Sequence, residues 1–286
     1  MIHAVPEMFK PKIRVEYPPD NKQIFEEWFA DNVKEIPGDR VYLPVNWTGF
    51  QVNNDYGNGR KMHDLQEYID GLDRSKKYFT ITQYDDGPLV DFKDLDIKVF
   101  GSGGGRIDCP IPLVCMPHSY QPDDVKTPKK RKYLASFVGS ITHPIRRKMI
   151  DYIISLPKED RERYFIFTDR MPIETFCQVM SESVFALCPR GYGKTSFRIC
   201  EALQYGAIPF YLSDEEDNFI YPFPDELEQD QCVWPMLGDY MHMLHSTLIN
   251  VEYPHLWQRE GQLVYPEYYT FDGCKNKILE WLKRLS

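Results

Sequence analysis

From Tyr133 onward, short apolar runs alternate with segments whose apolar residues recur at the spacing of an α-helix. The runs are typical of buried strands, which we expect at 133–138, 164–168, 184–188 and 208–212. The intervening segments predict helices at 144–156, 172–182 and 196–205. Strands that alternate with helices of this length predict a parallel sheet covered on both faces, hence an α/β fold.

Residues with strong positional preferences mark the ends of these helices. Pro144 suits the first helical position, because proline has no N–H to contribute there. Ser196 is a preferred N-cap, and Gly206 is typical of a helix end.

The N-terminal half shows the same alternation less clearly. Its predicted strands lie at 41–45, 78–84 and 97–100, with an amphipathic helix at 62–72. A last helix is expected at 275–285. The segment 117–132 is rich in proline and charge, which favours a linker between two halves. We interpret the basic residues of this segment as a solvated linker surface, and the alternative is a nucleic-acid-binding patch. These basic residues are Lys126, Lys129, Lys130, Arg131 and Lys132.

Length and charge limit the class of protein. The 286 residues suggest two domains at about 150 residues each. There are 34 Lys and Arg against 43 Asp and Glu, for a net charge of −9. Because nucleic acids and membrane surfaces are anionic, this balance argues against either as the main partner. The 42% hydrophobic content is enough to fill a core.

No apolar stretch approaches the length needed to span a bilayer, and the N-terminal segment lacks the apolar centre of a signal peptide. The seven cysteines include no CxxC pair, so neither a zinc site nor a disulfide framework is indicated. We therefore expect a cytoplasmic protein. In that compartment the sequon that begins at Asn46 is a chance occurrence.

Two strand-to-helix loops carry the chemistry that we consider most informative. In an open parallel sheet, ligands bind beyond the carboxyl ends of the strands. The loop 188–196 is glycine-rich and is followed by a helix, whose first N–H groups favour an anion. Arg190, Lys194 and Arg198 lie at this positive helix end, where a cation is unfavourable unless an anion is bound. A diphosphate is the expected ligand.

The second loop repeats the arrangement. Gly139 and Ser140 follow a predicted strand, and Arg146 and Arg147 lie in the first turn of the next helix. The alternative is that these arginines are ordinary surface residues or pair with Asp and Glu. Two cationic loops at one sheet edge favour the anion site.

Glu201 lies three residues after Arg198, so the two share a face of the helix. Its carboxylate is placed to accept hydrogen bonds from a ribose diol while phosphates occupy the helix start. The alternative is an ion pair with Arg198, and the two roles are compatible.

Three other patterns are weaker. Gly193, Lys194 and Thr195 resemble the end of a P-loop, but position 188 is cysteine where that motif needs glycine. The run 101–106 has arginine in place of the third glycine of a dinucleotide fingerprint. His242 and His245 share a predicted helix face without a clear third ligand, so no metal site is expected.

The candidates for a catalytic base are Asp85 and Asp86, at the end of the predicted strand 78–84. A carboxylate there would face a cleft between domains and take a proton from an acceptor hydroxyl. The alternative is that this Asp-Asp-Gly-Pro sequence only forms a turn. Asp55 and His118 are held in reserve.

The segment 185–214 carries a dense motif. It reads Phe-Ala-Leu-Cys-Pro-Arg-Gly at 185–191, then Ser196, Arg198, Glu-Ala-Leu at 201–203, Gly206, Ile-Pro at 208–209 and Ser-Asp at 213–214. In order and spacing it closely resembles the nucleotide-sugar signature of exostosin-like glycosyltransferases. The resemblance is strong over 133–223 and weak in the residues before 133. Within the strong part, the segment 137–140 with Arg146 also resembles the strand-to-helix element that precedes this signature in the family.

The resemblance implies a GT-B fold, in which two Rossmann-like domains with parallel sheets face each other. The expected boundaries are 1–125 for the acceptor-side domain, 126–270 for the donor-binding domain, and 271–286 for a helix that returns to the first domain. It also implies sugar transfer from a UDP-sugar to a hydroxyl of a glycan acceptor, such as a glycan on a glycoprotein, with inversion at the anomeric carbon. No metal or other cofactor is required by this interpretation.

Carried over by position, and combined with the two cationic loops, the donor site comprises Gly139, Ser140, Arg146, Arg190, Gly191, Lys194, Thr195, Ser196, Arg198 and Glu201. The compact chain looks most like small soluble family members of microbes and large algal viruses, which implies xylose as the sugar and a viral source. The alternative function is a non-catalytic module that binds a nucleotide-sugar or glycan without transferring it.

Overall fold

The structure is a computed structural model that describes residues 1–12, 23–120, 130–214, 221–227 and 233–285. The chain forms two compact units. Unit 1 combines residues 1–116 with 271–286, and unit 2 spans 117–270. Each unit contains one parallel β-sheet, so the α/β class that the sequence predicts is confirmed.

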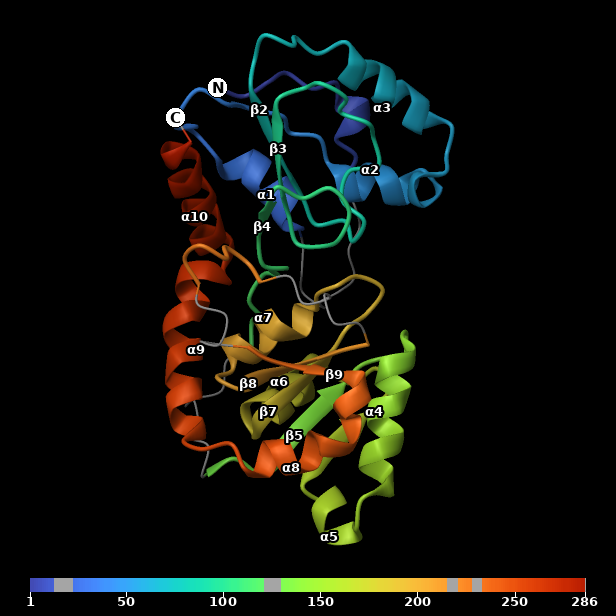
Figure 1. The fold of residues 1–286 in the computed structure, drawn as a ribbon, viewed down its shortest axis with the longest axis vertical. Helices are drawn as coiled ribbons and strands as arrows, with labels where there is room; N and C mark the ends of the chain where they lie inside the picture. Colours follow the sequence, from blue (N-terminus) through green and yellow to red (C-terminus); the bar gives the residue numbers. More distant parts are fainter. Residues whose placement is uncertain (13–22, 121–129, 215–220, 228–232, 286) are drawn as a thin grey trace. The chain divides into compact units, whose positions relative to one another are not determined.

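Unit 2 is built on a five-stranded sheet with the order β6-β5-β7-β8-β9 (Figure 1). Its strands are β5 (Tyr133–Val138), β6 (Tyr164–Phe167), β7 (Ser183–Pro189), β8 (Ile208–Ser213) and β9 (Trp234–Leu237). All four pairings are parallel. Alternate strand residues, such as Phe185, Leu187 and Phe210, form a hydrophobic core together with Met149 of the helix that follows β5. The order reverses direction at β5, whose neighbours are β6 on one side and β7 on the other.

Three helices of unit 2 begin within one residue of their predicted starts: α4 (Pro144–Ser155), α6 (Ile173–Ser181) and α7 (Phe197–Gln204). The helices α5 (Lys158–Arg161), α8 (Leu244–Ile249) and α9 (Pro254–Tyr268), and the 3-10 helix η4 (Gly238–Met243) before α8, were not predicted. Ser196 caps α7 by accepting a hydrogen bond from the N–H of Arg198, and Gly206 has a positive φ of 62° just after the helix. The N-cap of α4 is the imidazole of His143, which accepts from the N–H of Ile145.

Unit 1 has a four-stranded parallel sheet whose strands follow chain order: β1 (Val41–Tyr42), β2 (Tyr78–Thr82), β3 (Ile97–Gly101) and β4 (Cys109–Pro110). The predicted strand 41–45 is shorter than expected, although the N–H of Leu43 still donates to the carbonyl of Phe79 at 2.8 Å. Helices α2 (Trp47–Asn53) and α3 (Lys61–Asp70) contribute Trp47, Leu65 and Ile69 to the core. The 3-10 helices η1 (Glu7–Phe9) and η2 (Asp55–Gly57) complete this part.

Two helices of unit 1 lie far apart in sequence and pack together. The first, α1 (Phe25–Asn32), was not predicted, and the second, α10 (Phe271–Arg284), begins four residues before the predicted helix 275–285. Phe271 packs edge-on against Phe25 with ring centroids 5.4 Å apart, and Trp281 packs on Phe100 at 5.0 Å. These aromatic contacts explain why the C-terminal helix belongs to unit 1.

The predicted linker 117–132 lies mostly outside the described residues, but both of its described ends are packed onto unit 2. Arg131, which was expected to be solvated, is 8% exposed. Its guanidinium donates to the carbonyls of Ser183 at 2.7 Å and Tyr205 at 3.1 Å. Burial lowers the pKa of Arg131 to about 10. The guanidinium of Arg131 therefore binds backbone carbonyls at the start of β7 and the end of α7 instead of facing solvent. Lys126 and Lys129 of the same basic run lie outside the described residues.

Candidate functional site

The candidate donor site lies at the carboxyl edge of the sheet in unit 2, where β5 and β7 are neighbours. This is the point at which the strand order changes direction, and such a point is where ligands bind in open α/β sheets. The loop after β5 contains Gly139 and Ser140, and the loop after β7 runs over 190–196. Topology thus brings together the two loops that the sequence singled out for their cations.

Arg146, in the first turn of α4, joins the two loops. Its Nη1 donates to the carbonyl of Ser140 at 2.8 Å, and its Nε donates to the carbonyl of Arg190 at 3.0 Å. A Cβ placed on Gly191 would lie 3.3 Å from Arg146 Nη2, so the loop backbone runs close to the guanidinium. The positive charge of Arg146 is therefore fixed between both loops.

Arg190 extends this charge toward the end of β8. Its Nη1 donates to the carboxylate of Asp214 at 3.0 Å, and its Nη2 donates to the carbonyl of Tyr192 at 2.9 Å. Asp214 also lies 3.7 Å from the Nε2 atom of His143. The pairing with an acidic residue that the sequence left as an alternative is thus present for Arg190. Because Asp214 is 38% exposed at its side chain, the pair lies at the surface of the site.

Arg198 and Glu201, on the first turns of α7, form a buried ion pair with Arg198 Nη1 and Glu201 Oε2 2.9 Å apart. Glu201 is 1% exposed and Arg198 7%. The Nη2 group of Arg198 donates to the carbonyl of Val138 at the end of β5, and its guanidinium lies 4.5 Å from the ring centroid of Phe176. The ion pair expected from their spacing is confirmed. The contact of Glu201 with a ribose stays a prediction.

The rest of the loop after β7 is held through its backbone. The hydroxyl of Tyr211 donates to the carbonyl of Lys194 at 2.8 Å. Lys194, Thr195 and Ser196 are partly exposed, as a loop that receives a ligand requires. Cys188, at the place where a P-loop would have glycine, is buried in the strand, and burial raises the pKa of its thiol.

In unit 1, Asp85 and Asp86 form a turn just after β2. The N–H of Gly87 donates to the carbonyl of Tyr84 at 2.9 Å, and Gly87 has a φ of +69°. Both aspartates are partly exposed. The turn expected as the alternative is therefore present, and the role of either aspartate as the base stays a prediction.

The glycine run 101–105 is explained by this turn. The N–H of Gly104 donates to the carbonyl of Asp85, and a Cβ on Gly103 would lie 2.6 Å from the Cα atom of Asp85. Gly105 has a φ of +68°. The glycines let two loop backbones approach each other, which is a structural reason for a pattern resembling a dinucleotide fingerprint.

Sequence reasoning missed a buried carboxylate beside the same turn. Glu26, in the first turn of α1, accepts hydrogen bonds from the backbone N–H of Gln83 and from both the N–H and the hydroxyl of Thr48. Burial is the main cause that raises the pKa of Glu26 to about 7. The available signal was the i, i+3, i+4 spacing of Phe25, Trp28 and Phe29, which predicts a buried helix face.

The two reserve candidates for the base occupy different environments. Asp55 is exposed in η2 and has a positive φ of 52°. His118 is buried in unit 2, with its Nε2 atom 3.0 Å from Glu201 Oε1 and its side chain 0% exposed. His118 is thus engaged with the donor-side ion pair rather than exposed to an acceptor.

Residues that suggest metal or covalent chemistry have other partners in the described chain. Six cysteines are buried and form no disulfide. The seventh, Cys232, lies outside the described residues. His245 contacts the hydroxyl of Tyr164 at 2.9 Å and Asp160 at 3.2 Å. Asn46, the first residue of the sequon, is buried and caps α2.

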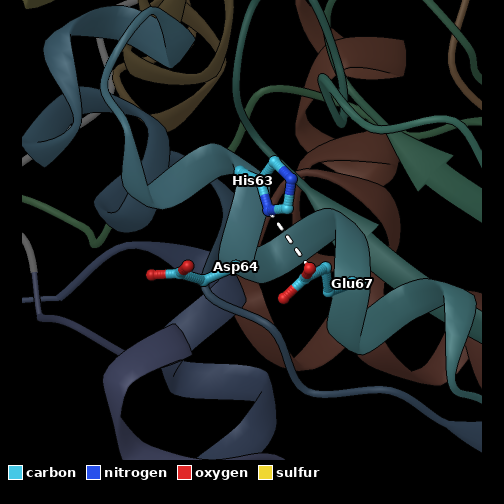
Figure 2. Close-up of side chains that lie close together, drawn as sticks. All are labelled: His63, Asp64 and Glu67. Atoms are coloured by element: carbon cyan, nitrogen blue, oxygen red, sulfur yellow. Dashed lines mark ion pairs between the residues drawn. The ribbon is translucent and has the colours of Figure 1, made fainter.

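Within the described residues, one group of side chains is close enough to ligate a metal, and it lies on α3 of unit 1. Figure 2 shows its members, the exposed His63, Asp64 and Glu67. His63 Nδ1 and Glu67 Oε1 are 3.5 Å apart, the distance of an ordinary i, i+4 pair on a helix surface.

No helix in the described residues combines the length and apolar character needed to cross a membrane.

Comparison with known proteins finds a family model that matches the part of the chain containing both cationic loops. Residues 99–234 match the Exostosin GT47 domain. A probable glucuronosyltransferase of Oryza sativa subsp. japonica is 29% identical over 101 residues, which cover 35% of this chain and 23% of that protein. The Exostosin-1 homolog of Caenorhabditis elegans is 22% identical over 209 residues, which cover 58% of this chain and 54% of that protein.

Among solved structures, an alpha-glucosyltransferase in complex with UDP and a 13-mer DNA aligns over 92% of this chain and 84% of that chain, with 9% identity and a TM-score of 0.46.

The match confirms the resemblance to exostosin-like glycosyltransferases for the segment that contains both cationic loops. The chain corresponds to less than a quarter of the rice relative and to about half of the nematode one. The plant and nematode relatives lend no support to a viral xylosyltransferase, so the sugar and the source stay predictions, as does the cytoplasmic location.

Proposed function

We propose that the protein is a glycosyltransferase of GT-B type that moves a sugar from a UDP-sugar donor to a hydroxyl of a glycan acceptor, such as a glycan on a glycoprotein. One observation carries the proposal: Arg146, Arg190 and Arg198 meet at the switch point between β5 and β7. The same segment matches the Exostosin GT47 domain. A diphosphate is the ligand whose charge suits three guanidinium groups at two helix starts.

The donor is proposed to bind at the loops after β5 and β7. The N–H groups at the starts of α4 and α7 and the three arginines would contact the diphosphate, with Lys194 and Thr195 beside it. Gly139 and Gly191 would allow close approach of the backbone. Glu201 enters the proposal as the residue that holds Arg198, because its carboxylate is 1% exposed and contacts Arg198 and His118. A ribose would reach that carboxylate only after one of those contacts opened.

The proposed reaction inverts the anomeric carbon. Asp85 or Asp86 takes the proton of the acceptor hydroxyl, whose oxygen forms a bond to the anomeric carbon as the bond from that carbon to the diphosphate oxygen breaks. UDP leaves with the electron pair of that bond. The arginines and helix N-termini stabilise the charge that develops, so the proposed chemistry requires no metal. The transferred sugar is proposed to be xylose, with glucuronic acid tested beside it because of the name of the rice relative.

The deciding experiment compares Arg198→Ala and Arg198→Lys with wild type. UDP release is measured with UDP-xylose, UDP-glucose and UDP-glucuronic acid, with and without a panel of glycan acceptors. We expect Arg198→Ala to lower acceptor-dependent turnover by about tenfold or more, because a charged donor to the leaving group is lost. Arg198→Lys, which keeps the charge without the planar fork, should be intermediate.

Arg147→Ala is the matched control, since Arg147 is an exposed neighbour in the first turn of α4. Circular dichroism establishes that each variant is folded. Near-normal transfer by folded Arg198→Ala would refute the phosphate role. Tight UDP binding without turnover, unchanged in an Asp85→Ala/Asp86→Ala variant, would instead favour a non-catalytic binding module.

A further inference from the structure

Beneath the proposed donor site, three buried side chains contact one another in series, from the first residues of unit 2 to the end of β5. The series consists of His118, Glu201 and Arg198, and ends at the carbonyl of Val138. The side chains of the three residues are 0%, 1% and 8% exposed. Water therefore does not compete for these contacts, and the position of each group depends on the next.

His118 is held firmly on α7. Its backbone N–H and carbonyl both contact the amide group of Gln204, each at 3.3 Å. Its ring stacks on Tyr205 with centroids 6.3 Å apart and meets the edge of Phe176 at 5.6 Å. The backbone of Tyr120 is fixed in the same region, because the hydroxyl of Tyr205 donates to its carbonyl at 2.8 Å. The imidazole is thus placed from several directions.

Each oxygen of the Glu201 carboxylate lies against a different side chain of this series. A carboxylate only accepts, so the Nε2 atom of His118, 3.0 Å from Oε1, carries the hydrogen in this contact. Oε2 faces Nη1 of Arg198 at 2.9 Å. His118 engages Oε1, so the contact with Nη1 of Arg198 is made by Oε2, whereas arginine and carboxylate favour a bidentate pair when both oxygens are available. Nη2 of Arg198 then remains on the carbonyl of Val138.

We propose that His118 is a positioning residue for the donor: it holds Glu201 so that the guanidinium of Arg198 stays at the end of β5, aimed for an anionic phosphate group. The inference rests on the proposed function for its ligand, but the positioning itself concerns only this chain. Without the imidazole, the carboxylate turns its second oxygen toward Arg198. The guanidinium then pairs bidentately and leaves Val138.

The test uses the whole chain and UDP as the probe, with dissociation constants measured by calorimetry. His118→Leu should weaken UDP binding about tenfold, the effect of losing a hydrogen bond to a charged group. His118→Gln has an amide N–H at a reach similar to Nε2 and should stay within about threefold of wild type. His245→Leu is the matched control, because His245 is also a buried histidine of unit 2 beside a carboxylate, and it should leave UDP affinity unchanged.

A double-mutant cycle separates positioning from a general loss of structure. In an Arg198→Ala background, His118→Leu should change UDP affinity by less than about twofold, because the group through which it acts is gone. Full additivity of the two effects would overturn the proposal, as would failure of His118→Gln to restore binding.

Crystal structures of wild type and His118→Leu supply a readout that needs no ligand. The guanidinium of Arg198 should leave the carbonyl of Val138 in the variant, and an unmoved guanidinium would refute the inference. Should His118→Leu not fold, His118→Asn takes its place, since its shorter amide does not reach Glu201. If wild type binds no UDP while Arg198 moves as expected, the proposed function fails and the positioning role stands.

Discussion

Each unit has a glutamate buried beside the carboxyl edge of its sheet, and the two carboxylates interact with different kinds of groups. Glu201 in unit 2 faces a cation, Arg198, and an imidazole, His118. Glu26 in unit 1 faces backbone N–H groups and one hydroxyl, those of Gln83 and Thr48. Both are less than 4% exposed. Hydrogen bonds alone do not offset the burial of Glu26, which is why its pKa is raised to about 7.

The difference shows what each carboxylate does for its loops. Glu201 fixes a cation whose charge is available to a ligand at the edge of the sheet. Glu26 fixes a backbone, because it attaches the segment after β2 to α2 through its two backbone contacts. Around Glu26 the loops touch through glycine backbones, whereas around Glu201 they are joined by arginine side chains. The edge of the sheet in unit 2 therefore has positively charged side chains between its loops, whereas the loops at the edge in unit 1 are joined by close backbone packing.

The sharpest way to break this comparison is to neutralise each carboxylate. Glu201→Gln should lower the free energy of unfolding by about 3–5 kcal/mol, because Arg198 is left buried without its counter-charge. Glu26→Gln at pH 8 should cost much less, since the loss of one acceptor at Thr48 is offset by the removal of a buried charge. Urea unfolding of both variants decides. Equal losses would show that the two sites are not electrostatically different.

The second prediction concerns pH. Because the pKa of Glu26 is higher in the folded protein than the ordinary value of 4.5, the folded state keeps its proton longer than the unfolded state. This glutamate therefore contributes most to stability below about pH 4.5, and the contribution falls as pH rises to about 7. The loss across this window should be on the order of 3 kcal/mol.

Glu26→Gln should remove that slope, so the difference between wild type and variant is measured by urea unfolding from pH 4.5 to 8. A difference that does not change with pH would contradict the origin assigned to the shift in pKa.

The smallest effect tests the backbone contact in unit 1. Gly105→Ala should cost about 1–3 kcal/mol, because its φ of +68° is unfavourable for alanine and the new Cβ would lie 2.6 Å from the carbonyl carbon of Asp86. Gly71→Ala is the matched control, since its Cβ would meet its neighbours at 3.5 Å. Thermal unfolding compares the two. A neutral Gly105→Ala would show that the turn of Asp85 and Asp86 is not held by this close approach.

Much of unit 2 could be predicted because its signals are local. Pro144 and Ser196 mark the starts of α4 and α7, and the apolar runs at 133–138 and 208–212 correspond to β5 and β8. The match to the Exostosin GT47 domain covers this segment. Unit 1 was less predictable, because its elements are held by partners from distant segments of the chain. Helix α1 was missed, and β1 has two residues where a strand over 41–45 was predicted.

The sequence by itself determined that cations gather at two strand-to-helix loops, because chain order places arginines just after apolar runs. Only the tertiary structure decided which of their hydrogen-bonding groups are engaged. Arg146 contacts the carbonyl of Arg190, 44 residues away, and His118 contacts a carboxylate 83 residues away. No local pattern encodes such pairs, because they arise when the sheet brings β5 and β7 side by side. Whether a buried carboxylate meets a guanidinium or an amide depends on that packing.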